Sequence, residues 1–360
     1  MKARIIIGAN LGDEGKGTIT ARYTKQAEGP VLNVLTNGGA QRAHSILTEN
    51  GSFTFQHFGS GTYHGADNYF SEYFILNPMQ FVKEYNELRN RGVKIGKIYR
   101  DPKCIWSTPW DMMANQIIEE MRGKAKHGSC GMGIWETVKR YRRQVCISFD
   151  DFLTFEDMDK LAYLNSIKSY YERRRVIPDH WKEIWNSDGL KDHFIADCKI
   201  MESTTTTLLL PEQYNEVIFE NGQGLMLCDT GINTPGTTPS YTDSRDAIAL
   251  INKKFKIDDV SVHYVTRSYM TRHGNGYLDK ECNHKYISSD IQDDRTNHFN
   301  EHQGEFRYGI LNISDLKNRI YDDNHGYERI IEVTHCDEMD QEEQFRKTFS
   351  NVNFYGTAQV

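Results

Sequence analysis

The stretch Ile5–Thr18, which reads IIIGANLGDEGKGT, decides the fold of this chain. Three apolar β-branched residues lead directly into a turn that is rich in glycine and also carries two carboxylates and a lysine. A strand that feeds a glycine-rich turn is how α/β proteins bring backbone N–H groups close to phosphate. Lys16 adds a positive charge, whereas phosphate would repel Asp13 unless a divalent cation bridges the two or the carboxylate takes part in the reaction. The stretch therefore predicts phosphoryl chemistry with Mg²⁺.

The turn differs from the phosphate-binding loop of P-loop NTPases. That loop has a glycine five residues before the glycine at position 15, and Ser or Thr directly after the lysine. Here Asn10 and Gly17 occupy those two positions. An ordinary turn between a strand and a helix is the alternative interpretation of this stretch taken alone.

Charge and composition exclude several classes of function. The chain has 360 residues, a net charge of -7, 38% hydrophobic and 26% charged residues. Its negative charge argues against a nucleic-acid-binding surface, and no apolar run approaches the roughly 20 residues that cross a membrane. The first strand begins almost at once, so we expect no signal peptide. We therefore expect no nucleic acid and no membrane among the partners.

The cysteines indicate a reducing compartment. The chain has seven, with no C-x-x-C pair among them, which is typical of free thiols in a cytoplasmic protein. Cys282 and His284 are a weak hint of a metal site, and without a second pair we expect no structural zinc there. The expected location is the cytoplasm, which would be the host cytoplasm if the protein is viral.

Short β-rich runs alternate with helical patterns along the chain. Most of the runs lack polar–apolar alternation, which is typical of buried strands in a parallel sheet. The fold class is therefore α/β, with a central, largely parallel β-sheet, helices on both faces and helical insertions. We expect a single domain over residues 1–360 with a helix-rich insertion at about 100–210. The predicted strands are Ala3–Ile7, Val31–Leu35, Val217–Glu220, Val260–Thr266, Arg329–Thr334 and Val352–Tyr355, and helices are predicted at Pro78–Arg91 and Asp157–Arg175.

Polar and glycine-rich loops follow these predicted strands repeatedly. In parallel sheets, binding sites form beyond the carboxyl ends of the strands, and six such loops are difficult to explain by the fold alone. They are Gly8–Thr18, Asn37–Ser45, Asn221–Gly224, Thr271–Gly276, His335–Asp337 and Gly356–Thr357.

The order of these loops resembles the adenylosuccinate synthetase family. The family's GDEGKG segment is identical to Gly12–Gly17, and its G-G-x-N-A-G-H-T loop is similar to Gly38–Ser45, which keeps the histidine. Its F-E-G-A-Q-G and S-T-R-V-G-x-G segments resemble Phe219–Gly224 and Met270–Gly276. The resemblance runs in order across nearly the whole chain. It implies the fold of that family, which is P-loop-like, and a ligase that joins L-aspartate to the 6-position of a purine nucleotide at the expense of a nucleoside triphosphate.

The resemblance also implies roles for individual residues. Asp13 would be the general base at purine N1, and His44 the general acid as a phosphoryl group moves to O6; each such role is typically worth about 10² to 10⁴ in rate. The triphosphate would be bound by Gly12, Glu14, Gly15, Lys16, Gly17, Thr18, Asp337 and Gly356. The purine monophosphate would be bound by Asp13, Gln41, Ser129, Cys130, Gln223, Thr242 and Arg143. L-Aspartate would be bound by Arg307, Gln303 and Arg272, and Mg²⁺ by Asp13 and the backbone carbonyl of Ala43.

Departures from the family pattern affect the substrate pockets. Leu11, Gln41 and Arg42 replace a Trp, an Asn and a small residue in the first two loops, and the arginine-rich aspartate loop keeps only Arg307. The guanine-reading T-K-L-D becomes Thr334–Asp337, without the lysine. These changes and the short chain are similar to the viral branch, which makes 2-aminoadenylosuccinate from dGMP. Some viral members replace the carboxylate that this chain keeps at Asp13.

The leading hypothesis is accordingly a ligase that acts on dGMP, L-aspartate and ATP. The alternatives are an ordinary adenylosuccinate synthetase that uses IMP and GTP, a purine-nucleotide-binding protein without activity, and a GTPase-like switch. The basic run Lys139–Arg143 lies where the family sends an arginine into the neighbouring subunit's site, so a homodimer is expected. A solvent-exposed basic helix face is the alternative for this run.

Overall fold

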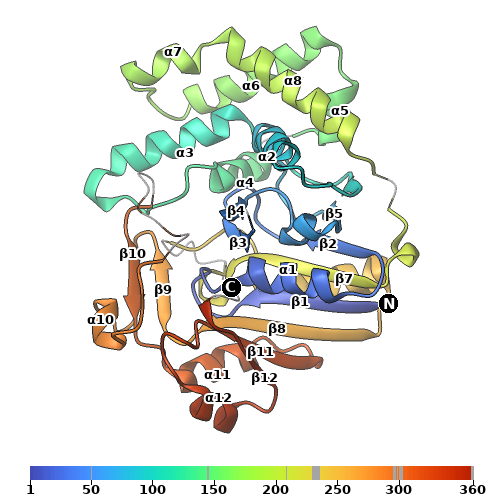
Figure 1. Ribbon diagram of the computed structural model, residues 1–360. Helices are drawn as coiled ribbons and strands as arrows, with labels where there is room; N and C mark the ends of the chain where they lie inside the picture. Colours follow the sequence, from blue (N-terminus) through green and yellow to red (C-terminus); the bar gives the residue numbers. More distant parts are fainter. Residues whose placement is uncertain are drawn as a thin grey trace.

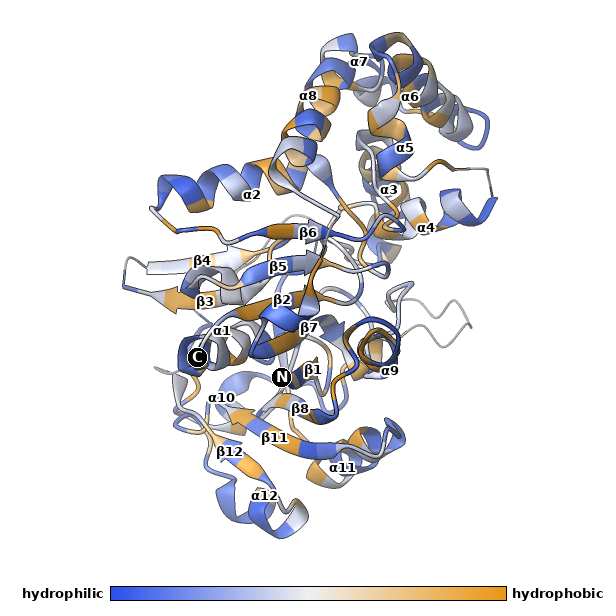
Figure 2. Ribbon diagram, turned by 90° about the vertical axis from the view of Figure 1, so that its right-hand side faces the viewer, coloured by the Kyte–Doolittle hydropathy of each residue, from blue (hydrophilic) through white to orange (hydrophobic). Residues whose placement is uncertain are grey.

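A sheet of parallel strands forms the centre of the computed structural model, which describes residues 1–49, 51–143, 146–207, 209–228, 236–294, 297, 299 and 303–357 (Figure 1). Within these residues the sheet has eight strands, and every neighbouring pair is parallel. The order is β12 (Val352–Phe354), β11 (Glu328–Thr334), β8 (Asp259–Arg267), β1 (Lys2–Gly8), β7 (Glu216–Gly224), β2 (Val31–Leu35), β5 (Asp67–Phe70) and β6 (Ile98–Arg100). Figure 2 shows the strands one above another, from β12 at the bottom to β6 at the top.

This architecture confirms the α/β class with a largely parallel sheet. All six predicted strands belong to the central sheet, and helix α2 (Pro78–Asn90) lies where one was predicted. The sequence pattern missed β5 and β6, which have four and three residues. Both are short, and the Asp, Asn and Arg residues among them interrupt the apolar run by which the other strands were predicted. Two antiparallel pairs of strands were also missed. One is a hairpin of β3 (His44–Thr48) and β4 (Gly51–Phe55), and the other pairs β9 (Met270–His273) with the distant β10 (Phe306–Gly309).

Helices cover both faces of the sheet because successive side chains of a strand point to opposite sides. Ile6 of β1 packs with Ile19 of α1 (Lys16–Gln26) on one face. Ile5 and Ile7 pack on the other face, in a cluster that includes Leu250 of α9 (Arg245–Leu250). A run without alternation is therefore what a strand between two helical layers requires.

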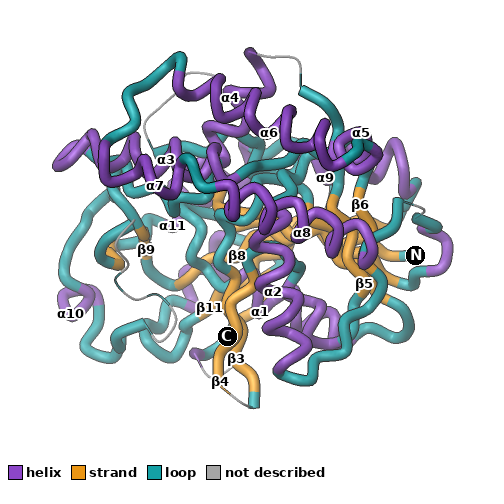
Figure 3. Tube along the Cα trace, turned by 90° about the horizontal axis from the view of Figure 1, so that it is seen from above, coloured by secondary structure: helices purple, strands orange, loops and turns teal. Residues whose placement is uncertain are grey.

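The chain between β6 and β7 is helical and lies beyond the β6 edge of the sheet. Figure 3, seen from above, shows these helices in front of the sheet. They are α3 (Pro109–Arg122), α4 (Ile134–Arg143), α5 (Phe149–Thr154), α6 (Asp157–Glu172), α7 (Lys182–Trp185) and α8 (Asp188–Thr204). The remaining helices are α10 (His284–Ile287), α11 (Ile313–Asp322), α12 (Glu342–Thr348) and a π-helical turn at Ile251–Phe255.

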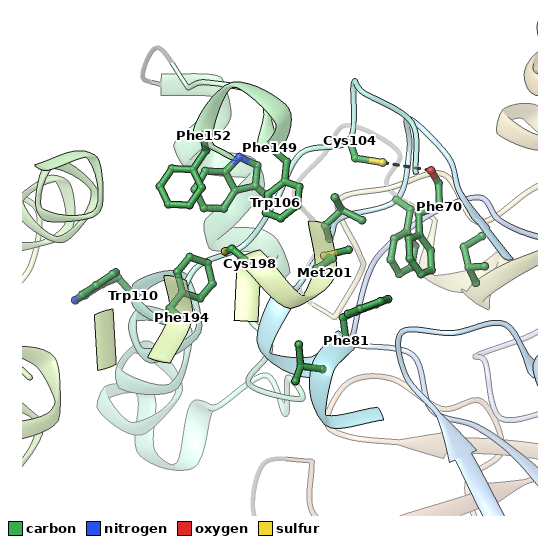
Figure 4. Close-up of a cluster of buried hydrophobic side chains, with 14 of the residues drawn as sticks. Phe70, Phe81, Cys104, Trp106, Trp110, Phe149, Phe152, Phe194, Cys198 and Met201 are labelled. Carbon is green, nitrogen blue, oxygen red and sulfur yellow. Dashed lines mark hydrogen bonds between the residues drawn. The ribbon is translucent and has the colours of Figure 1, made fainter. Parts of the chain in front are cut away.

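An aromatic core fastens this helical segment to the sheet edge (Figure 4). Trp106 and Phe194 of α8 stack with ring centroids 6.1 Å apart, and both side chains are fully buried. Phe70 of β5 belongs to the same cluster, and the Cys104 thiol donates to its carbonyl at 3.4 Å. Burying such large side chains contributes roughly 1.5–3 kcal/mol each, so this core holds the helices in place over the sheet edge.

Among the described residues, no helix combines the length and the apolar composition that a membrane crossing requires.

Candidate active site

The glycine-rich turn between β1 and α1 is held from within by its own charged residues. Gly12 and Gly15 have φ angles of 122° and 95°, which side chains other than glycine rarely adopt. The Glu14 carboxylate accepts from the backbone N–H groups of Asn10 and Gly12 at 3.1 and 2.8 Å. The Lys16 ammonium donates to the Gly12 carbonyl at 2.6 Å. Glu14 therefore braces the turn, and it lines neither of the two cavities described below; its predicted contact with the triphosphate stays a prediction.

The Asp13 carboxylate has no hydrogen-bond donor among the described residues. Burial raises its pKa above the ordinary value of an aspartate, and the neighbouring Glu14 carboxylate raises it further. His273, Lys16 and Arg267 oppose the shift with positive charge. An unpaired carboxylate whose pKa is raised is a better proton acceptor than an ordinary surface aspartate.

His44 begins β3 and is fixed by a buried carboxylate from β7. Its Nδ1 lies 2.5 Å from Glu220 Oε1. The Ser60 hydroxyl and backbone N–H donate to the two oxygens of the same carboxylate at 2.7 and 2.9 Å. Glu220 has no exposed surface. The short contact places the ring proton on Nδ1, and Nε2 has no hydrogen-bond partner among the described residues.

Arg42 supplies the charge that balances Glu220. Its Nη2 lies 3.0 Å from Glu220 Oε1 and 3.0 Å from His44 Nδ1. Burial would raise the pKa of Glu220, but Arg42 outweighs it together with His44 and Ser60, so that the carboxyl has a pKa of about 2 and is ionised. Burial, followed by the charge of Arg42, lowers the pKa of His44 to about 4. The imidazole is therefore neutral at pH 7 in the free protein.

Two cavities meet at Asp13 and His44. The smaller, of about 120 Å³, lies along the glycine-rich turn and contacts Lys16 and Thr18. The larger, of about 410 Å³, extends from Leu11 toward α3 and α4. Asp13, Ala43 and His44 line both. A group bound in one cavity is therefore next to a group bound in the other, as transfer between two ligands requires.

The larger cavity brings together amide and hydroxyl groups from distant segments. Gln41 Nε2 donates to the Thr238 hydroxyl at 2.7 Å. Gln223 has a φ of 56°, and its Oε1 is buried with no partner in the described part of the chain. Both amides lie 3.2 Å from where a Cβ on Gly38 would stand, and Gly38 has a φ of 67°, which favours glycine at this position. Ser129, Cys130, Arg272 and Gln303, all predicted from the sequence, also line this cavity.

The arginines predicted to bind aspartate differ in their surroundings. Arg272 lines the larger cavity, and its Nε is buried without a partner among the described residues. Arg307 instead forms an ion pair with Glu281 and donates to the carbonyls of Gly274 and Gly276 at 2.9 and 3.0 Å. It lines neither cavity. The single arginine left in the loop is thus used to hold the loop together.

The basic run of α4 contains residues with different environments. Arg140 is fully buried and donates to both oxygens of Asp111 at 2.9 Å, so it belongs to the core and cannot reach a partner. Lys139 lines the larger cavity and donates to Glu136 at 3.0 Å. Arg142 and Arg143 are exposed at the end of the helix, and Arg143 does not line the cavity of its own chain.

Three further predicted residues do not line either cavity. Thr242 is buried and donates to the Gly224 carbonyl at 2.9 Å. The Asp337 carboxylate accepts from the Thr357 N–H and hydroxyl at 2.7 and 2.6 Å, and Gly356 lies beside it. Thr357 itself contacts the smaller cavity. The carboxylate expected to read guanine is thus bonded to Thr357, and its contact with a base stays a prediction.

Sequence reasoning missed two residues that the structure places at the site. Glu220 was part of a quoted motif without an assigned role, and Arg267 was not singled out. Glu220 lies in the middle of the buried strand β7, and Arg267 is the last residue of β8. A charged residue in an otherwise apolar run, which is costly to bury unless it is paired, was the signal that could have found them.

The structure defines an α/β protein with two adjoining cavities, one of which lies along the glycine-rich turn. The family model of adenylosuccinate synthetase matches residues 5–346. The chain therefore belongs to the adenylosuccinate synthetase family, whose members are carbon–nitrogen ligases.

Relatives at moderate sequence identity support this assignment. The adenylosuccinate synthetase of Malacoplasma penetrans is 26% identical over 303 residues, which is 80% of this chain and 67% of that protein. The adenylosuccinate synthetase of Halothermothrix orenii is 28% identical over 342 residues, which is 89% of this chain and 74% of that protein. The matched segments thus leave a quarter to a third of these relatives uncovered.

Two solved structures share the fold. Fully ligated adenylosuccinate synthetase from Plasmodium falciparum has a TM-score of 0.69 at 18% identity, covering 94% of this chain and 78% of that chain. The second is the succinoaminodeoxyadenylate synthetase of cyanophage S-2L, bound to dGMP and to dATP as an energy donor. It has a TM-score of 0.67 at 12% identity, and the match covers 99% of this chain and 91% of that chain. At these identities the likeness concerns the fold alone.

Proposed function

We propose that this protein joins L-aspartate to the 6-position of dGMP through a 6-phosphoryl intermediate, with ATP as the phosphoryl donor. The products are 2-aminodeoxyadenylosuccinate, ADP and phosphate. The observation that carries this proposal is the position of Asp13 and His44 at the junction of two cavities. A protein that only binds nucleotide needs neither a base nor an acid at that point.

The first step requires the purine oxygen to become a nucleophile. Asp13 accepts the N1 proton, so that negative charge develops on O6. His44 then stabilises this charge as the γ-phosphoryl group arrives. The neutral ring seen in the free protein gains a proton more readily once an anionic nucleotide is beside it, and Glu220 already holds Nδ1. The amine of L-aspartate displaces phosphate in the second step.

The residues at the junction fit Mg²⁺. Asp13, whose carboxylate has no hydrogen-bond donor among the described residues, and Ala43, whose backbone carbonyl is the predicted second ligand, line both cavities. Mg²⁺ prefers such oxygen ligands and usually takes one or two from protein and the rest from phosphates and water. The ion would neutralise charge on the triphosphate.

Three observations favour dGMP and ATP over IMP and GTP. Gln41 uses its amide N–H on Thr238 and keeps its carbonyl for the exocyclic amine of dGMP. The Asp337 carboxylate already accepts two hydrogen bonds from Thr357, and the lysine of the guanine-reading segment is missing beside it, so this chain lacks the full guanine-reading set. The structural relative from cyanophage S-2L was solved with dGMP and dATP.

The choice of substrates is tested by comparing kcat/KM for dGMP, GMP, IMP and dIMP, with ATP and GTP in turn. We expect dGMP to exceed IMP by tenfold or more, because a site built to pair with an amine rejects an analogue without it. ATP is expected to exceed GTP. A tenfold preference for IMP would instead identify an ordinary adenylosuccinate synthetase with a divergent pocket.

We predict that Arg272 binds a carboxylate of L-aspartate. Changing Arg272 to Gln should raise the KM for L-aspartate about 10- to 100-fold, since hydrogen bonds to charged groups contribute about 1.5–3 kcal/mol. The KM values for both nucleotides should change little. Arg307→Gln is the matched comparison, and a larger effect there would restore the assignment made from the sequence.

We predict a homodimer in which Arg143 of one subunit contacts the purine monophosphate of the other. The exposed end of α4 supports this arrangement. Sedimentation should show dimers, and Arg143→Ala should raise the KM for dGMP while leaving that for ATP unchanged. Arg142→Ala is the control for a general loss of charge. A monomer with full activity at nanomolar concentration contradicts the prediction.

A further inference from the structure

Arg267 is the last residue of β8, and it contacts the catalytic turn directly. Its Nε donates to the backbone carbonyl of Asp13 at 2.7 Å. The Thr271 hydroxyl is more distant from the same oxygen, at 3.5 Å. Only 5% of the Arg267 side chain is exposed, and its guanidinium lies 5.4 Å from the centre of the Phe306 ring. The contact is therefore shielded from water, which strengthens it.

The other two nitrogens of Arg267 reach the far wall of the smaller cavity. Nη2 pairs with Asp294 at 2.6 Å, and Nη1 donates to the Tyr269 hydroxyl at 3.2 Å. The Tyr269 hydroxyl donates in turn to Glu338 at 2.5 Å, which also accepts from the backbone of Gln292 at 3.1 Å. All of these residues line the smaller cavity. One guanidinium thus connects that wall to the turn that carries the base.

We propose that Arg267 is a positioning residue that holds Asp13 in its reactive orientation and couples that orientation to the occupant of the smaller cavity. This inference rests on the proposed function, because it takes the smaller cavity as the site of the triphosphate. A nucleotide that contacts Asp294 acts on Arg267 directly, and one that contacts Glu338 acts on it through the Tyr269 hydroxyl. Arg267 transmits either effect to the Asp13 backbone.

Arg267 adds a restraint at Asp13 itself to the bonds that Glu14 and Lys16 already make with Gly12. Gly12, directly before Asp13, has a φ of 122° and no side chain to limit its rotation. The Asp13 carboxylate has no hydrogen bond of its own among the described residues. A displacement of about 1 Å in a reacting group can lower a rate about 10²-fold. The hydrogen bond from Arg267 to the Asp13 carbonyl therefore bears directly on the rate of the chemical step.

The test compares Arg267→Met, Arg267→Lys and Tyr269→Phe with the unaltered protein. Arg100→Met is the control, because Arg100 is buried in a similar ion pair with Asp150, away from both cavities. Steady-state kinetics give kcat and the three KM values, and thermal melting reports folding. Calorimetry measures the Kd of dGMP with and without a non-hydrolysable ATP analogue.

We expect Arg267→Met to lower kcat at least about tenfold with little change in the KM of dGMP. In the unaltered protein the ATP analogue should tighten dGMP binding at least about fivefold, and in the variant less than about twofold. Arg267→Lys should recover part of kcat, and Tyr269→Phe should reduce the coupling without unfolding the protein. The control should lower the melting temperature but keep kcat and the coupling.

Unchanged kcat in folded Arg267→Met, or coupling retained in both Arg267→Met and Tyr269→Phe, overturns the inference. So does a ratio of Kd values near one in the unaltered protein. If that protein forms no product from any purine monophosphate, the proposed function fails instead. The calorimetric coupling still distinguishes the two cases, because it does not depend on turnover.

Discussion

Replacing Asp13 by Asn should lower kcat by about 10² to 10⁴, the range typical of losing a general base. The amide keeps the size of the side chain and removes the basic oxygen that accepts the N1 proton. Because Glu14 and Lys16 hold the turn without help from the Asp13 side chain, the fold should survive. Steady-state kinetics with dGMP, L-aspartate and ATP measure the effect.

A control distinguishes loss of the base from loss of the turn. Glu14→Gln removes the charge of the adjacent carboxylate but keeps an oxygen that can accept from the Asn10 and Gly12 N–H groups. It should cost stability more than turnover, and calorimetry should show dGMP binding in both variants. A folded Asp13→Asn protein with near-normal kcat would remove the proposed base from the mechanism.

The second large effect is expected at the pair formed by His44 and Glu220. His44→Ala should lower kcat at least about 100-fold, since it removes the group that stabilises charge on O6. Glu220→Gln should have an effect in the same direction, because the amide can no longer balance a protonated ring through Nδ1. It also leaves buried Arg42 without its anionic partner, a loss of about 3–5 kcal/mol for buried pairs.

Their shared role is tested by combining the two changes. If Glu220 acts through His44, the double variant should be about as slow as His44→Ala alone, because effects within one functional unit are not additive. Ser60→Ala, which removes one donor to Glu220, should have a much smaller effect. Fully additive losses would show that Glu220 serves only the stability of the fold.

Much of the architecture is local enough to be predicted from the chain. The strand before the glycine-rich turn, the absence of alternation in buried strands and the helix at Pro78 all depend on neighbouring residues. The order of the loops was sufficient to indicate the family, which the family model confirms over residues 5–346. Asp13, Lys16 and His44 could be selected as candidate site residues because each belongs to a short loop whose sequence resembles a family motif.

The partners of those residues depend on contacts between distant segments. Glu220 reaches His44 across 176 positions, and Arg267 reaches Asp13 across 254. No local pattern reports such pairs, because the parallel sheet brings together the carboxyl ends of strands that are far apart in sequence. The same holds for Arg307 and Asp337, whose charges suggested contacts with substrate. In the structure Arg307 forms an ion pair with Glu281, and Asp337 accepts a hydrogen bond from Thr357.

Local conformation and periodicity are enough to predict the α/β sheet, the glycine-rich turn and the residue types available for acid–base chemistry. Which charged groups remain open to a ligand is settled in the folded protein. That outcome depends on burial and on pairing across the sheet: a buried charge must find a partner, and the partner that the fold supplies determines whether the group braces the protein or faces a cavity.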